Sequence, residues 1–161
     1  MDSVALDEDA GNVLVTTGDV ETCTRCLDGG DPDRRAELTV TYPGESAEDA
    51  GFGDHSRVQP AKKGLISVSD SMRSAASAER AGPDFTGAVA QDAIADPTNL
   101  QRLGTSISEF CQRWDDEDYD IYVCFDSLSA LLEYTSPVVV FQFCHVLAKR
   151  LESVDATAHF H

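Results

Sequence analysis

The residues best suited to chemistry lie in the stretch Tyr119 to Tyr134, YDIYVCFDSLSALLEY, where an apolar run ends at Asp126 and Ser127. A carboxylate at the end of a buried strand, followed by a hydroxyl, can hold a magnesium ion beside a nucleotide. The same carboxylate can instead accept hydrogen bonds from the free N–H groups of a helix that begins at Leu128. Two interpretations of Asp126 therefore stay open, a magnesium ligand or a helix cap.

A second candidate set combines two cysteines with two histidines. Cys23 and Cys26 are three residues apart, a spacing found in metal-ligand and redox pairs. His159 and His161 share one face of a predicted last strand and would complete a zinc site. The acidic residues just before the cysteines disfavour the thiolate that a redox pair needs. The alternatives are two small thiols in the core and a solvated strand end.

Composition predicts the habitat and excludes one class of partner. The 161 residues include 29 acidic and 12 basic side chains, giving a formal charge of −17, and the only lysines are Lys62, Lys63 and Lys149. The acids are spread along the chain, which is typical of proteins from a salt-saturated cytoplasm, where screening removes self-repulsion. We therefore expect a halophilic archaeal protein. Because no basic stripe could neutralise phosphates, no nucleic-acid partner is expected.

Length and hydropathy predict one cytoplasmic domain. A chain of 161 residues fits a single domain over residues 1–161. No run approaches the roughly 20 apolar residues of a membrane span, and the first residues are acidic where a secretory signal would be basic. We expect no membrane partner, and we interpret the five cysteines as reduced thiols.

Apolar runs alternate with helical patterns along the chain. Strands are predicted at residues 12–17, 36–42, 64–69, 88–94, 119–125 and 156–161, and helices at 19–28, 97–114, 128–134 and 137–153. Asp96 is predicted to cap the second helix, with Pro97 at its first position. The run 119–125 is apolar without alternation, which predicts an interior strand. The pattern predicts an α/β fold with a three-layer, doubly wound, mainly parallel sheet.

Three segments carry a family resemblance: VCFDSLSALLEY, VFQFCHVLAKRL and ATAHFH. Together they resemble the RecA superfamily, in particular its KaiC-like branch and a haloarchaeal family of RecA-like proteins of unknown function, sometimes labelled transducer-like proteins. The resemblance is strongest over residues 88–161. It implies a RecA-like P-loop NTPase fold, with Asp126 as the magnesium ligand and Ser127 beside the nucleotide.

The phosphate-binding turn of that superfamily is degenerate in this chain. Phosphate binding needs a glycine-rich turn with a lysine and a Ser/Thr after the first strand. The corresponding segment, TTGDVETCTRCLDG, has Gly18 at the turn and no lysine. Asp19 and Glu21 add negative charge where a helix N-terminus would attract phosphate. We therefore expect the fold without a functional phosphate loop, no cofactor beyond a residual Mg-ATP site, and no catalytic residue.

The segment Val138 to Phe143, VVVFQF, is apolar nearly all round a helix, which predicts burial from a second direction. The chain ends with its last predicted strand, whereas the family it resembles continues with more sheet. Either the chain is a fragment, or another subunit covers the sheet edge. We expect a protein partner or a homo-oligomer formed through the helix over residues 138–151 and the sheet edge.

Three functions remain open at this point. The favoured one is a non-catalytic RecA/KaiC-like module in haloarchaeal regulation or signalling that acts by binding a protein. The second is an ATP/Mg-binding protein or nucleoside triphosphatase that uses Asp126 with an atypical phosphate site. The third is a metal or redox protein that uses Cys23 and Cys26.

Overall fold

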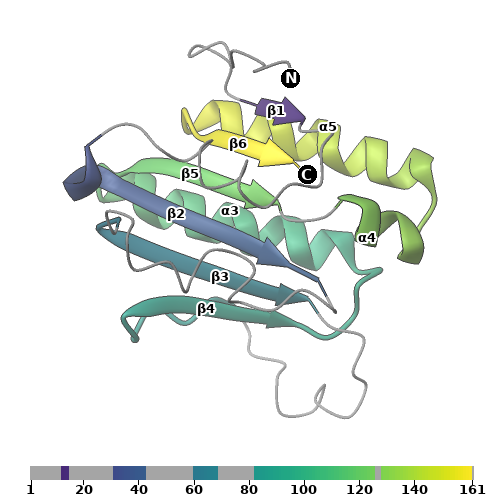
Figure 1. Cartoon of the computed structure of the whole chain (residues 1–161), viewed down its shortest axis with the longest axis horizontal. Helices are drawn as coiled ribbons and strands as arrows, with labels where there is room; N and C mark the ends of the chain where they lie inside the picture. The colour runs from purple at the N-terminus through teal and green to yellow at the C-terminus, as the bar shows by residue number, and fades with distance from the viewer. Residues whose placement is uncertain (1–11, 15–30, 43–59, 69–81, 126–127, 161) are drawn as a thin grey trace, which may run out of the picture.

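The computed structural model describes residues 12–14, 31–42, 60–68, 82–125 and 128–160 (Figure 1). The described strands form one sheet in the order β1-β6-β5-β2-β3-β4, and every pairing in it is parallel. Their bounds are β1 (Asn12–Leu14), β2 (Arg35–Thr41), β3 (Lys62–Val68), β4 (Val89–Ile94), β5 (Asp120–Phe125) and β6 (Thr157–Phe160), with a short 3-10 helix η1 (Pro32–Arg34) before β2. The predicted α/β class with a parallel sheet is confirmed.

Strand β5 occupies the interior position that its continuous hydrophobicity predicts. It pairs with β2 on one side and β6 on the other, and Ile121, Val123 and Phe125 are buried. Strands β1 and β2 follow one another among the described strands but are not neighbours, because β6 and β5 lie between them. Two strands that come later in the sequence, β6 and β5, are therefore inserted between β1 and β2 in the sheet.

Helices α3 (Leu100–Asp116) and α5 (Pro137–Ser153) lie side by side on one face of the sheet, with the short α4 (Leu128–Tyr134) before α5 (Figure 1). The predicted apolar stripe of α3 is buried at Leu103, Ile107, Phe110, Cys111 and Trp114. Helix α5 has its predicted bounds, and its N-cap Ser136 accepts a hydrogen bond from the N–H of Val139 at 3.4 Å. These elements are compatible with a three-layer fold, which stays a prediction. None of the described helices is long and apolar enough to cross a membrane.

The predicted start of α3 is wrong by one turn. Asp96 does not cap the helix, because its carboxylate accepts hydrogen bonds from the N–H and the hydroxyl of Thr98, at 2.9 and 2.6 Å. Those bonds close a local turn that competes with helix initiation. The helix begins three residues after Pro97, where the side chain of Asn99 accepts a hydrogen bond from the N–H of Arg102 at 3.1 Å.

A buried carboxylate joins α3 to the edge strand β4. The side chain of Asp92 is fully buried and forms an ion pair with Arg102 at 2.9 Å. It also accepts hydrogen bonds from the hydroxyl of Ser106 at 2.5 Å and from the N–H of Ala93 at 2.9 Å. Both carboxylate oxygens therefore have donors, which is the condition under which a buried charge is tolerated.

Glycine allows α3 to approach β3 closely. A Cβ atom at Gly64 would lie 2.8 Å from Cε1 of Phe110 and 2.8 Å from Cη2 of Trp114. The two aromatic rings contact each other with their centroids 5.4 Å apart. The absence of a side chain at position 64 thus sets the distance between the helix and the sheet.

Candidate functional site

The order of the strands defines a place where a ligand could bind. Strand β3, which follows β2 in the sequence, lies on the side of β2 away from β5, whereas β6, which follows β5, lies on the side of β5 away from β2 (Figure 1). In open α/β sheets, ligands bind outside the carboxyl ends of two adjacent strands whose connections diverge in this way. That point lies between Thr41 and Phe125, and Asp126 follows Phe125 directly in the sequence.

On the helix side of this edge the described residues form a packed aromatic cluster. The ring of Phe125 contacts those of Tyr42, Phe143 and Phe160, with centroid distances of 5.7, 6.2 and 5.8 Å. The hydroxyl of Tyr42 is buried and has no hydrogen-bond partner among the described residues. Burial, with smaller contributions from Cys144 and Tyr134, raises the pKa of Tyr42 far above its ordinary value. Tyr42 therefore stays protonated at neutral pH and cannot act as a base.

The opposite side of the same edge is polar. Side chains alternate along a strand, so Thr39, Cys124 and His159, which are paired across β2, β5 and β6, face away from α3 and α5. All three are buried, and His159 is only 3% exposed. The expectation of a solvated strand end at His159 is therefore wrong. Strand β6 is also an interior strand of the sheet, because β1 pairs with its other edge.

Toward the amino ends of the strands, the same face carries a buried ion pair. The Nε atom of Arg35 lies 2.7 Å from Oε1 of Glu37, and the Arg35 guanidinium lies 4.3 Å from the centroid of the Tyr122 ring. Both charged side chains are on β2. Glu37 compensates the charge of Arg35, and the Tyr122 ring adds a cation–π contact to the guanidinium, so we interpret this cluster as structural.

Most of the predicted ligand residues lie outside the described residues. This applies to Asp126 and Ser127 of the magnesium site and to Cys23, Cys26 and His161 of the zinc set. Only His159 can be placed, and α4 begins at Leu128 as predicted. Over residues 12–14, 31–42, 60–68, 82–125 and 128–160, no three His, Cys, Asp or Glu side chains are placed to hold a metal ion. Both predicted metal sites stay predictions.

The described cysteines are reduced and poorly suited to react. Cys111, Cys124 and Cys144 are not joined in disulfide bonds. Burial, with a smaller contribution from Asp115, raises the pKa of Cys111 from 9.0 to about 12, and burial also raises the pKa of Cys144. Because the thiolate is the nucleophile and the metal ligand, neither cysteine is available for such chemistry at neutral pH.

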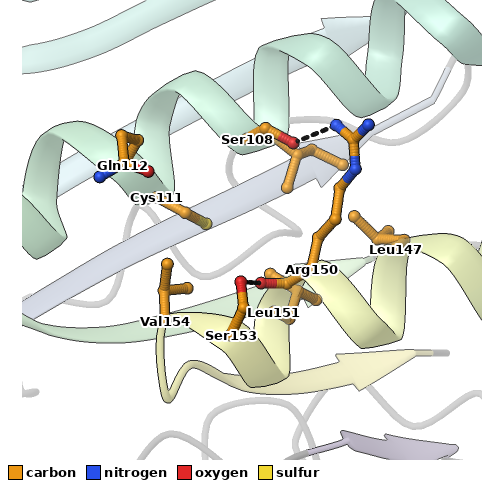
Figure 2. Close-up of a pocket in the computed structure, with 9 residues that line it drawn as sticks. Ser108, Cys111, Gln112, Leu147, Arg150, Leu151, Ser153 and Val154 are labelled. Atoms are coloured by element: carbon orange, nitrogen blue, oxygen red, sulfur yellow. Dashed lines mark hydrogen bonds between the residues drawn. The ribbon is translucent and has the colours of Figure 1, made fainter.

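A groove lies between α3 and α5 in the described part of the chain. Its larger part has a volume of 410 Å³ and is lined by Leu100, Gln101, Gly104, Thr105, Val139, Gln142, Phe143, Val146, Leu147 and Arg150. Its smaller part, of 180 Å³, lies nearer the end of α5 (Figure 2). Arg150 lines both parts and donates a hydrogen bond to the hydroxyl of Ser108 on α3 at 2.9 Å. Cys111 lines the smaller part, as Figure 2 shows.

Helix α5 exposes large apolar side chains beside this groove. Val138, Phe141 and Val146 are 66%, 72% and 53% exposed, and Val139 is exposed as well. Apolar residues exposed together in this way mark interaction sites more often than isolated ones do. The sequence signal was the run VVVFQF, but it did not reveal that α3 completes the surface. We call the groove and the exposed residues of α5 the α3/α5 face.

The α3/α5 face also differs in charge from the rest of the chain. No acidic residue occurs from Pro137 to Leu151, and none lines either part of the groove, although the chain has 29 acids. The charged side chains on this part of α5 are Lys149 and Arg150. The face can therefore bind apolar groups without placing carboxylates against a partner.

Comparisons with known proteins give a family and no activity. The sequence profile of a "Family of unknown function (DUF7504)" matches residues 10–161. Neither the curated proteins nor the solved structures gave a match.

Proposed function

The chain belongs to the DUF7504 family, whose function is unknown, and we propose that it is a non-catalytic RecA/KaiC-like regulatory or signalling module of a halophilic archaeon. It acts by binding a protein through the α3/α5 face. The observation that carries the proposal is the exposure of Val138, Phe141 and Val146 around a helix that has no acidic residue as far as Leu151. If this part of α5 faced only solvent, we would expect it to carry acidic residues, as the described helices α3 and α4 do.

Two features of the fold support the RecA/KaiC-like part of the proposal. The sheet is parallel, and β5 is an interior strand whose last residue directly precedes Asp126. The sequence that follows β1 has no lysine as far as Arg35 and contains Asp19 and Glu21, whose charge disfavours phosphate, and this favours a module that has lost nucleotide hydrolysis. The charge of −17 supports the halophilic habitat.

Replacing Phe141 with glutamate in the native host tests the proposal. A charge at a mostly exposed position should leave the fold intact but place a carboxylate in the contact with the partner. We expect the Phe141→Glu strain to reproduce the transcript profile of a strain that lacks the gene, whereas Asp126→Asn should leave the wild-type profile unchanged. The measurement is RNA sequencing of the three strains, with immunoblots to check that both variants accumulate normally. A wild-type profile for Phe141→Glu would refute binding through this face.

A second function, Mg-ATP binding or hydrolysis, is favoured by one observation. The strands that follow β2 and β5 in the sequence lie on opposite sides of this pair, and α/β proteins bind ligands at the carboxyl ends of such strand pairs; Asp126 follows β5 directly in the sequence. In this alternative Asp126 holds the magnesium ion, Ser127 lies beside the nucleotide, and a neighbouring subunit supplies the phosphate contacts. The protein would then be a nucleoside triphosphatase or a nucleotide-dependent switch.

Calorimetric titration of Mg-ATP distinguishes the two functions. In multimolar KCl, which keeps the acidic surface screened, we expect no saturable heat up to millimolar Mg-ATP, because the chain lacks the phosphate-binding lysine. ADP and GTP serve as comparison ligands. Micromolar binding by the wild type that disappears in Asp126→Asn would establish the nucleotide site and overturn the non-catalytic proposal.

A further inference from the structure

We infer that the partner bound by the α3/α5 face is a second copy of this chain, with α5 of each copy lying in the groove between α3 and α5 of the other. This inference rests on the proposed function, because it names the occupant of the same face. It makes the chain an isologous dimer, in which one surface binds to itself around a two-fold axis.

The face carries both a ridge and a groove. Val138, Phe141 and His145 follow one another at spacings of three and four residues, so they form a ridge along the exposed side of α5. The rings of Phe141 and His145 stack with their centroids 6.3 Å apart and their planes inclined by 12°. Val139 and Val146 lie on the flank toward α3 and line the groove instead. Helices pack by placing ridges of one into grooves of another, and this face presents one of each.

The groove has room for side chains of the ridge. Its larger part measures 410 Å³, and Gly104 contributes no side chain to it. Leu100, Val139 and Phe143 supply apolar walls. Helices α3 and α5 have 17 residues each and are therefore about 25 Å long, and side by side they present about 500 Å² in projection. Because side chains make the surface uneven, its accessible area is larger than this projection and approaches the roughly 800 Å² per partner that stable dimers bury.

The distribution of charge favours the α3/α5 face over other surfaces as the place where two copies of the chain meet. Two chains of charge −17 repel one another, but the α3/α5 face brings no acids of the groove or the ridge together. Glu133 lies in the last turn of α4, four residues before α5 begins, whereas the end of α5 carries two bases, Lys149 and Arg150, against one acid, Glu152. Among the described residues, Glu133, Lys149 and Arg150 form no ion pair, and the guanidinium of Arg150 donates a hydrogen bond to the neutral hydroxyl of Ser108. An antiparallel arrangement of two α5 helices places the acid of one copy near the bases of the other.

Sedimentation equilibrium of the purified full chain in multimolar KCl tests the dimer. We expect the wild type to be dimeric, and Phe141→Glu on the ridge to raise the dimer dissociation constant about 30-fold or more, as loss of an interface hot spot does. Gly104→Leu should weaken the dimer as well, because its side chain fills the groove; a Cβ at this position meets Phe143 at an ordinary contact distance of 3.5 Å. Gln91→Glu, which adds one charge at an exposed position of β4, should dimerise like the wild type. Circular dichroism spectra that match the wild type would show that each variant keeps its secondary structure, so that a change in the dissociation constant reports on the interface.

Mixing the two variants tests the ridge-in-groove arrangement itself. A Phe141→Glu chain keeps its groove and a Gly104→Leu chain keeps its ridge, so the mixture should form heterodimers with one intact contact, while each variant alone stays mostly monomeric. A monomeric wild type, or a Gly104→Leu protein as dimeric as the wild type, would overturn the inference. A monomeric wild type combined with a Phe141→Glu strain that still reproduces the gene deletion would remove the dimer and leave the proposed function standing.

Discussion

Replacing Asp92 with alanine is expected to lower the free energy of unfolding by about 3–5 kcal/mol, as removal of one member of a buried ion pair does. The loss has two parts. Arg102 loses its carboxylate partner at 2.9 Å, and the buried hydroxyl of Ser106 loses its acceptor at 2.5 Å. Because β4 is the edge strand and Asp92 joins it to α3, both elements should loosen. Urea unfolding at a fixed multimolar KCl concentration measures the effect.

Graded variants separate charge from packing at this site. Asp92→Asn keeps the shape and one acceptor, so it should cost less than Asp92→Ala. Ser106→Ala removes a single hydrogen bond and should cost about 1 kcal/mol. In the Asp92→Ala background, Arg102→Met should recover part of the lost stability, since the cation that faced the deleted carboxylate is removed as well. An Asp92→Ala protein within about 1 kcal/mol of the wild type would show that the network contributes little.

The local pattern of the sequence predicts the elements but not their assembly. The spacing of Leu103, Ile107, Phe110 and Trp114 predicts the buried face of α3, and Ser136-Pro137 predicts the start of α5. The error at Asp96 arose because a capping residue and a turn residue have the same chemistry, and only the three-dimensional chain shows which N–H groups the carboxylate meets. The strand order depends on contacts between segments far apart in the chain, which periodicity does not record.

The candidate site was predicted only in part for the same reason. The apolar run from Val138 to Phe143 predicts a binding helix, but the groove also needs Leu100 and Gly104, almost forty residues earlier in the chain. Strand β6 is an interior strand because β1 pairs with it, and its own residues do not predict that distant pairing, so they also did not predict the burial of His159. Asp92 gave no signal, because a single acid in the short run VAQDAI resembles a solvent-facing residue.

The close contact between β3 and α3 leads to a second large expected effect. Gly64→Val is expected to lower the free energy of unfolding by about 3 kcal/mol, at the upper end of the usual range for overpacked cores. Valine is favoured over glycine in strands, so the backbone alone would gain stability from this change. The loss must then come from the rings of Phe110 and Trp114, which lie 2.8 Å from the added Cβ. Urea unfolding again measures it, and Gly87→Val is the control, since its nearest neighbour is 3.4 Å away and the site is exposed.

A compensating substitution shows whether the aromatic rings cause the loss at Gly64. Trp114→Phe removes the outer indole atoms, including Cη2, and should itself be destabilising because it opens space in the core. In the double variant the valine fills part of that space. The double variant should therefore lose less stability than the sum of the losses of the two single variants, by at least about 1 kcal/mol. Strict additivity would mean that the strand, and not the helix contact, sets the requirement for glycine. A positive coupling would instead show that the packing of α3, and with it the position of the groove beside α5, depends on the missing side chain at position 64.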